Sequence, residues 1–193
     1  IMVSGIRYWQ LFMLTGSAVA VFPFFLGTMR GYMMERINVF LNPEANQDAA
    51  FNINQALIAI GSGGLFGLGY GHGTQTQLRF LKVRHTDFIF SAISEEFGLV
   101  GALFVIVIIV LIIWRCLRAA QKARDVAGMT IAYGVATLIF FQGMVNIGVN
   151  LNIVPVSGLP LPFISYGGSG LTSLMLGIGL VESVAMRYKQ LDF

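Results

Sequence analysis

The chain has 193 residues, of which 56% are hydrophobic and only 11% are charged, and its mean hydropathy is +0.76. Soluble domains carry about 25% charged residues, so this composition excludes a water-soluble globule, and it also excludes a disordered chain. A disulfide scaffold is excluded because Cys116 is the single cysteine, and the small net charge of +3 argues against a nucleic-acid partner. What remains is an all-α integral membrane protein, since the apolar runs are too long and unbroken for barrel strands.

Four apolar stretches are long enough to cross a bilayer as helices, which takes about 20 residues each. They run over residues 8–26, 88–114, 128–149 and 168–186. A further apolar stretch, Ala56–Gly73, is so rich in glycine that it predicts a re-entrant or interfacial segment buried in protein rather than a span. The expected fold is therefore four transmembrane helices with a large loop that contains this segment.

The distribution of basic residues predicts the orientation, because short cytoplasmic loops are enriched in Lys and Arg. The loop 115–127 contains Arg115, Arg118, Lys122 and Arg124, whereas the loop 151–167 has no charged residue. We therefore expect both termini and the basic loop to face the cytoplasm. The loops 29–86 and 151–167 are then expected to face outside.

A basic cluster lies at the end of the first external loop, just before the second span. It consists of Arg79, Lys82, Arg84 and His85. Cations at this level can collect an anionic lipid headgroup. The alternative is a plain interfacial basic belt with no ligand, and composition alone leaves both interpretations open.

Asp87 stands where this loop meets the second span, and two more carboxylates, Glu95 and Glu96, follow about two helical turns into it. An N-cap explains Asp87 alone, since Asp and the neighbouring Thr86 both favour that position. Carboxylates at membrane depth are costly and are candidates for function. At 1.5 Å per residue, Asp87 and Glu95 are about 12 Å apart along the axis, which favours one base with a distant supporting group over a hydrolase pair.

Three amides, Gln142, Asn146 and Asn150, recur every four residues on one face of the third span. Interhelical hydrogen bonding is the expected role, and lining of a polar cavity is the alternative. The glycines of Ala56–Gly73 are expected to permit a tight path, although their amides are also suited to a phosphate. No zinc site is predicted, because the two histidines lack the spacing of zinc ligands.

Six segments form a specific set of motifs that runs along nearly the whole chain. They are FLNP at Phe40–Pro43, IAIGSGGLFGLG at Ile58–Gly69, GTQTQLRFL at Gly73–Leu81, HTDFIFSAISEEFGLVG at His85–Gly101, NIG at Asn146–Gly148, and PVSGLPLPFISYGGSG at Pro155–Gly170. With these motifs the chain resembles the SEDS family (shape, elongation, division and sporulation), and its RodA branch more than its FtsW branch.

The resemblance implies a ten-helix glycosyltransferase of the bacterial inner membrane that polymerises lipid II into peptidoglycan, with inversion at the anomeric carbon. The four spans match the last four helices, so the remaining helices are expected on the same or another chain. A class B penicillin-binding transpeptidase is the expected partner. The alternatives are a flippase or transporter of lipid-linked precursors and a non-catalytic membrane scaffold.

The resemblance also implies roles for individual residues. Asp87, in the TDF motif, is expected to be the general base that deprotonates the acceptor hydroxyl. Charge on the leaving pyrophosphate calls for cations, and a divalent ion (Mg or Mn) is a further candidate for which no ligand set is visible. Glu95 or Glu96 is expected to orient the base, hold a basic residue or couple the helix to its neighbours. The complete set of substrate-binding candidates is Arg36, Arg79, Lys82, Arg84, Glu95, Glu96, Ser165 and Ser169.

Overall fold

The computed structural model describes residues 31–42, 47–77 and 86–188, and some of the residues between 9 and 21. The described part is helical and contains no β-strand, as expected for an all-α membrane protein. Its helices are α2 (Gly31–Leu41), α3 (Gln47–Gly63), α4 (Thr74–Gln77), α5 (Ile89–Gln121), α6 (Val126–Asn150) and α7 (Gly168–Tyr188).

Three of these helices, α5, α6 and α7, are long and apolar enough to cross a membrane. They correspond to the last three predicted spans. The first predicted span, residues 8–26, lies mostly outside the described residues, and the described residues within it are helical. This first span therefore stays a prediction.

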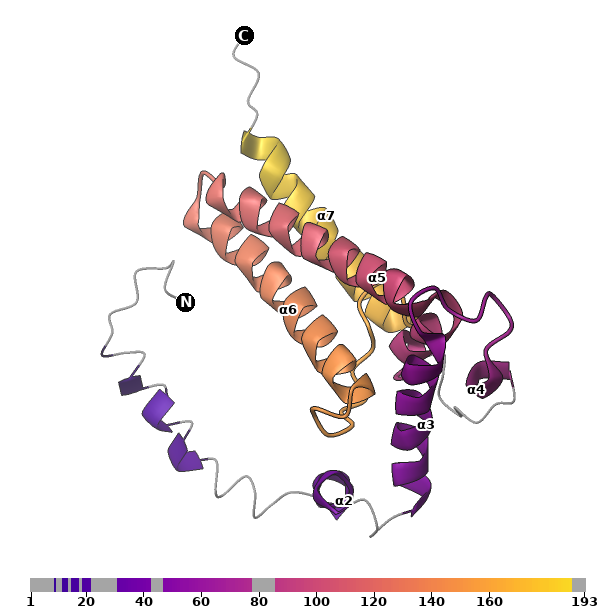
Figure 1. The fold of residues 1–193 in the computed structure, drawn as a ribbon. Helices are drawn as coiled ribbons and strands as arrows, with labels where there is room; N and C mark the ends of the chain where they lie inside the picture. Colours follow the sequence, from indigo (N-terminus) through magenta and orange to yellow (C-terminus); the bar gives the residue numbers. More distant parts are fainter. Residues whose placement is uncertain are drawn as a thin grey trace.

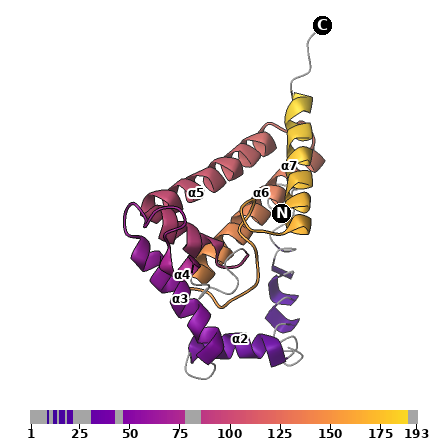
Figure 2. The same ribbon diagram turned by 90° about the vertical axis from the view of Figure 1, so that its right-hand side faces the viewer.

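The three long helices run alongside one another, and the shorter helices gather at one end of them (Figure 1). In the view of Figure 2, α2 lies across the base of this end, with α3 rising beside the start of α5. We call this the loop end; it carries α2, α3, α4 and residues 151–167. The opposite end, which we call the basic end, carries Arg115, Arg118, Lys122, Arg124 and Arg187.

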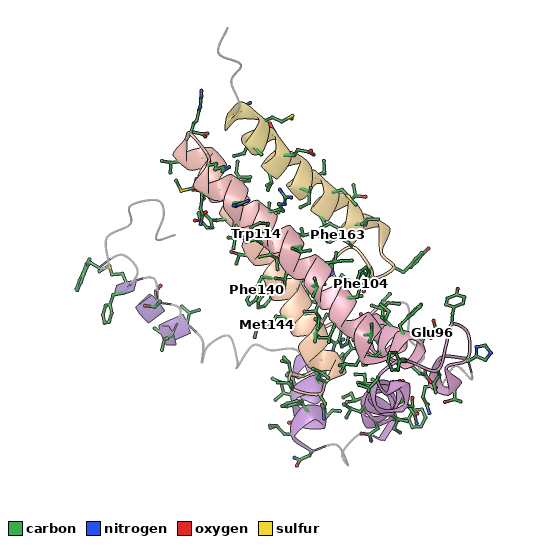
Figure 3. The ribbon with its side chains drawn as sticks, turned by 45° about the horizontal axis from the view of Figure 1, so that its top comes forward. Glu96, Phe104, Trp114, Phe140, Met144 and Phe163 are labelled. Carbon is green, nitrogen blue, oxygen red and sulfur yellow. The ribbon has the colours of Figure 1, made fainter. Side chains whose placement is uncertain are left out.

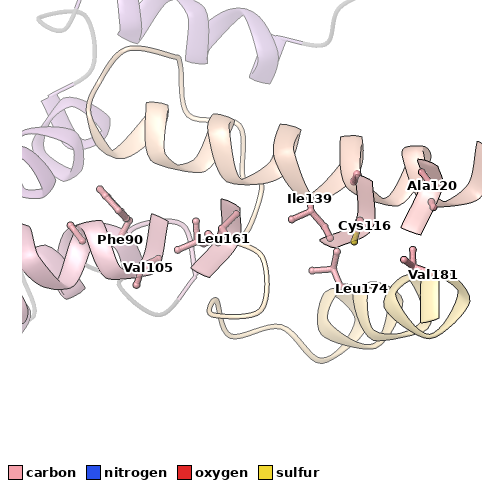
Figure 4. Packing of buried hydrophobic residues seen from close by; sticks show 12 residues of the cluster. Phe90, Val105, Cys116, Ala120, Ile139, Leu161, Leu174 and Val181 are labelled. Carbon is pink, nitrogen blue, oxygen red and sulfur yellow. The ribbon is translucent and has the colours of Figure 1, made fainter. Parts of the chain in front are cut away.

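Small and branched residues let the long helices approach closely, as is usual for helices packed in a membrane. Ala120 and Ala132 are completely buried, and a Cβ added to Gly177 would meet the methyl groups of Val135 at 3.4 Å. The buried cluster extends along the whole bundle, from Phe90 to Val181 (Figure 4). Apolar packing therefore continues to the basic end.

The structure carries α5 beyond the expected end of its span at residue 114, as far as Gln121. The added residues are mostly Ala, Arg, Leu and Gln, which are strong helix formers. The connection to α6 is correspondingly short. Asp125 caps α6, since its side chain accepts a hydrogen bond from the amide of Gly128 at 2.9 Å.

Gly98 breaks α5 near its start, a feature that the sequence analysis did not predict. Its backbone angles are φ 68° and ψ −164°, which lie outside the helical region and are accessible mainly to glycine. A Cβ at this position would overlap the backbone of Leu65 and Gly67. The first nine residues of α5 are therefore set apart from the rest of the helix by a close backbone contact with the turn after α3.

The turn after α3 repairs the hydrogen bonds that this break leaves open. The carbonyls of Glu95 and Glu96 each accept a bond of 3.0 Å, from the amides of Leu68 and Gly69. In the other direction, the amides of residues 99 and 100 donate to the carbonyls of residues 64 and 65 at 2.9 and 3.3 Å. The glycine-rich segment thus uses its amides inside the protein, because unpaired backbone groups are very costly at membrane depth.

Candidate functional site

Asp87 lies in the turn immediately before α5, and it does not cap that helix. The N-cap residue is Phe88, and no side chain makes a capping hydrogen bond there. The capping interpretation of Asp87 is therefore wrong. The Asp87 side chain is partly exposed, and the nearby Phe88 and Phe90 are buried.

Two asparagines of α6 hold the backbone of Asp87 in place. The side-chain amide nitrogens of Asn146 and Asn150 both donate to the Asp87 carbonyl, at 3.1 and 2.8 Å. Both side chains are buried, with exposed fractions of 1% and 0%. The expected hydrogen-bonding role of this stripe is thereby confirmed for these two residues, and the partner is the main chain of the candidate base.

The same asparagines join α5 and the loop 151–167 into one network. The Asn150 side-chain oxygen accepts bonds from the Ser91 hydroxyl at 2.6 Å and the Ser91 amide at 3.1 Å. The Asn146 amide nitrogen also donates to the carbonyl of Leu159 at 2.8 Å. Ser91 was not singled out in the sequence, because a lone serine in an apolar helix carries no signal of its own.

Ser165 makes a further hydrogen bond to the backbone of this turn, at the residue before Asp87. Its hydroxyl donates to the carbonyl of Thr86 at 2.7 Å and accepts from the amide of Leu161 at 2.8 Å. These bonds tie the loop 151–167 to the turn that carries Asp87. Ser165 therefore positions this turn, while its predicted contact with substrate stays a prediction.

Arg36 is the predicted cation that the structure brings to this site. Its guanidinium donates to the carbonyl of Val156 at 2.9 Å, so α2 is joined to the loop 151–167. Burial raises the pKa of Asp87 above its ordinary value, while a hydrogen bond from the Thr86 side chain and the charge of Arg36 oppose that rise. A carboxylate with a raised pKa is a stronger base when ionised, which suits proton abstraction near neutral pH.

Glu95 and Glu96 bind the segment between α3 and α4, and the start of α4. The Glu95 carboxylate, which is fully buried, accepts from the amide of Gln75 at 2.8 Å and the hydroxyl of Thr74 at 3.4 Å. Glu96 accepts from the amide of Gly71 at 3.4 Å. Figure 3 shows Glu96 at the loop end of α5, beside this segment. Of the three roles expected for these residues, coupling the helix to its neighbours has direct contacts behind it.

The other predicted site residues fall in two groups. Arg79, Lys82 and Arg84 lie outside the described residues. Ser169 is exposed in the first turn of α7. Across the residues that the structure describes, no three His, Cys, Asp or Glu side chains converge on a point, so the divalent cation stays a prediction from the sequence.

Comparison with known proteins gives one family. The family model for FtsW, RodA and SpoVE, described as a cell cycle protein, matches residues 1–190. Peptidoglycan glycosyltransferase MrdB of Escherichia coli K12 is 43% identical over 98% of this chain and 52% of its own length. Peptidoglycan glycosyltransferase RodA of Treponema pallidum is 40% identical over 93% of this chain and 42% of its own length. The chain thus spans about half the length of these relatives.

Two solved structures share the arrangement of the helices. A peptidoglycan synthase complex, described as coordinating polymerization and crosslinking, matches with a TM-score of 0.70 and 29% identity over 94% of this chain and 50% of its own. A mutant of the rod shape determining protein RodA from Thermus thermophilus matches with a TM-score of 0.54 and 38% identity. The second match covers 70% of this chain and 40% of that one.

Proposed function

We propose that this chain forms the catalytic half of a peptidoglycan polymerase, because it belongs to the FtsW, RodA and SpoVE family of cell cycle proteins. The substrate is lipid II, and the reaction is an inverting glycosyl transfer at the outer face of the bacterial inner membrane. The proposal extends to this chain the activity that its relatives carry in their names.

Asp87 acts as the general base in this proposal. Its carboxylate takes the proton of the acceptor hydroxyl while that oxygen attacks the anomeric carbon of the donor sugar. The bond from this carbon to the lipid pyrophosphate breaks on the opposite face, so the configuration inverts. Arg36 stabilises the charge that develops on the pyrophosphate, together with Arg79, Lys82 and Arg84 as the sequence predicts.

The observation that carries the proposal is the way Asp87 is held. Its main-chain carbonyl accepts two hydrogen bonds from buried asparagines, so the backbone is fixed while the carboxylate is used by none of these bonds. A base must be held within a few tenths of an ångström of its productive position, because small displacements are costly in rate. A residue that only began a helix would need no such support.

The proposal also includes an orientation in the membrane and a partner. We place both termini and the basic end in the cytoplasm, since the basic residues gather there, and the loop end outside. A class B penicillin-binding transpeptidase is the proposed partner, in line with the polymerization and crosslinking complex that the chain resembles. In a protein as long as these relatives, further helices complete the fold.

The test is polymerisation of lipid II by the purified intact protein, read as glycan strands on a gel. Asp87→Asn keeps the size of the side chain, and loss of a general base lowers rates by about 100- to 10,000-fold. Lipid II binding should change little, because cations hold the pyrophosphate. The matched control is Asp125→Asn, which removes a carboxylate that caps α6 at the far end and should leave the rate unchanged. Near wild-type polymerisation by Asp87→Asn would instead favour the flippase or the scaffold.

A further inference from the structure

A cavity of about 680 Å³ lies between α5 and α7 at the basic end, far from Asp87. Towards the middle of the bundle its walls are apolar and include Leu111, Ile112 and Ile178. Towards the end of the helices it is lined by Arg115, Arg118 and Lys122 of α5. The lining therefore changes from apolar to cationic in the direction that leads out of the bilayer.

Trp114 marks the depth at which this change occurs. Its ring is 45% exposed, and tryptophan is enriched where the hydrocarbon meets the headgroups. The guanidinium of Arg118 lies 4.6 Å from the centre of the ring and that of Arg115 lies 5.7 Å from it. From Gly98 to Arg118 the helix rises about 30 Å, the thickness of a hydrocarbon core. We therefore expect the two arginines at the level of the lipid phosphates.

The charge of the cavity points to an anionic occupant. Of the lining residues, Arg115, Arg118 and Lys122 are cationic and Glu182 alone is anionic, which leaves two positive charges in excess. An apolar helix laid in the cavity would match its inner walls but would bring no anion to the guanidinium groups of Arg115 and Arg118. A phospholipid matches both parts, since its phosphate meets the cations and its acyl chain follows the apolar walls.

We infer that this cavity binds one anionic phospholipid from the cytoplasmic leaflet, with its phosphate between Arg115 and Arg118 and an acyl chain along Ile112 and Ile178. The site is separate from the proposed active site and does not depend on it. It binds phosphatidylglycerol in preference to phosphatidylcholine, because the net positive charge of the lining favours a lipid with net negative charge.

The experiment is native mass spectrometry of the intact protein after incubation with phosphatidylglycerol or phosphatidylcholine in equal amounts. The wild type should retain phosphatidylglycerol preferentially. Replacing both Arg115 and Arg118 with Gln should weaken that retention by about 30-fold, from the typical contribution of each cation near an anionic lipid. Glu182→Gln removes the opposing charge and should strengthen retention, a change that general damage to the fold would not produce.

The matched control removes two cations at the same end that do not line the cavity. Arg124→Gln with Arg187→Gln should leave retention within about threefold of the wild type, if the contribution is local. Equal losses in the two double variants would overturn the site in favour of a diffuse surface potential. Retention of no phosphatidylglycerol by the wild type would also overturn it and would indicate that another segment of the protein fills the cavity.

Discussion

At the loop end, buried amide and hydroxyl groups join α6 by hydrogen bonds to the start of α5 and to the turn before it, whereas at the basic end the three long helices meet through alanine, glycine and valine. Asn146 and Asn150 supply the directed bonds at one end, and Ala120 and Ala132 supply the close packing at the other. Directed bonds fix the backbone in one position, while apolar contacts tolerate small shifts. The comparison indicates that precise placement is concentrated where the chemistry is proposed.

Gly98→Ala should have the largest effect, because it disturbs the break in α5 and the contact of this break with the turn after α3. The new methyl group is strained at this φ and overlaps the backbone of Leu65, so we expect a loss of about 3–5 kcal/mol in unfolding free energy. Thermal unfolding of the purified intact protein measures it. The control is Gly134→Ala, whose Cβ would meet nothing within 4 Å and which should be neutral or slightly stabilising. Equal stability of the two variants would mean that the break is not needed.

Asn150→Leu tests whether the buried amides of the loop end hold the base. It leaves the Asp87 carbonyl and the Ser91 amide each without this partner, so we expect a loss of about 2–4 kcal/mol. Polymerisation should fall by about 100-fold, because Asp87 moves from its productive position. Gln142→Leu is the matched control on the same face, since the buried Gln142 side-chain oxygen has no hydrogen-bond partner among the described residues. A similar fall in both variants would remove the special role of Asn150.

Ile139→Val probes the apolar half of the comparison. Ile139 is completely buried, and removing one methylene from such a position costs about 1 kcal/mol. We expect a small decrease in thermal stability with an unchanged rate of polymerisation, because packing there does not set the position of Asp87. A decrease in rate as large as that of Asn150→Leu would show that the two ends are not distinct in function.

The smallest expected effect is on the pH dependence of polymerisation, which also compares the loop end with the basic end. Only the ionised Asp87 accepts a proton, and its pKa is raised, so the rate should rise with pH over a range above that of an ordinary aspartate. Arg36→Gln removes a charge that lowers this pKa, so it should move the rising limb further towards high pH. Arg187→Gln, at the basic end, should leave the limb in place. A shift towards low pH in Arg36→Gln would contradict the assigned effect of Arg36.

The long helices were predictable because an apolar run of this length has few other structures available to it. The hydrogen-bonding role of Asn146 and Asn150 was also predictable, since residues four apart share a helical face. Their partner was not, because a main-chain carbonyl leaves no trace in the sequence. The N-cap alternative for Asp87 was wrong for a related reason: the turn that carries Asp87 is set by bonds from α6 and residues 151–167.

The break at Gly98 and the use of Glu95 could not be predicted either. A single glycine within an apolar run is usual in membrane helices, and its positive φ here depends on a contact with residues more than 30 positions earlier. Glu95 was recognised as unusual because a carboxylate at that depth is costly. The sequence could not show that the amide of Gln75 and the hydroxyl of Thr74 would bind it.

The break in α5 has a consequence for the way this protein enters the membrane. The first part of α5 ends at residue 97, and its last carbonyl groups depend on amides of the turn after α3. Residues 98–121 form a second helical part about 36 Å long. The second part is therefore long enough to be inserted by itself. The turn that completes the first part precedes α5 in the chain, so it is synthesised before the helix that needs it. Order of synthesis thus supplies the partner before the open carbonyls of Glu95 and Glu96 need one.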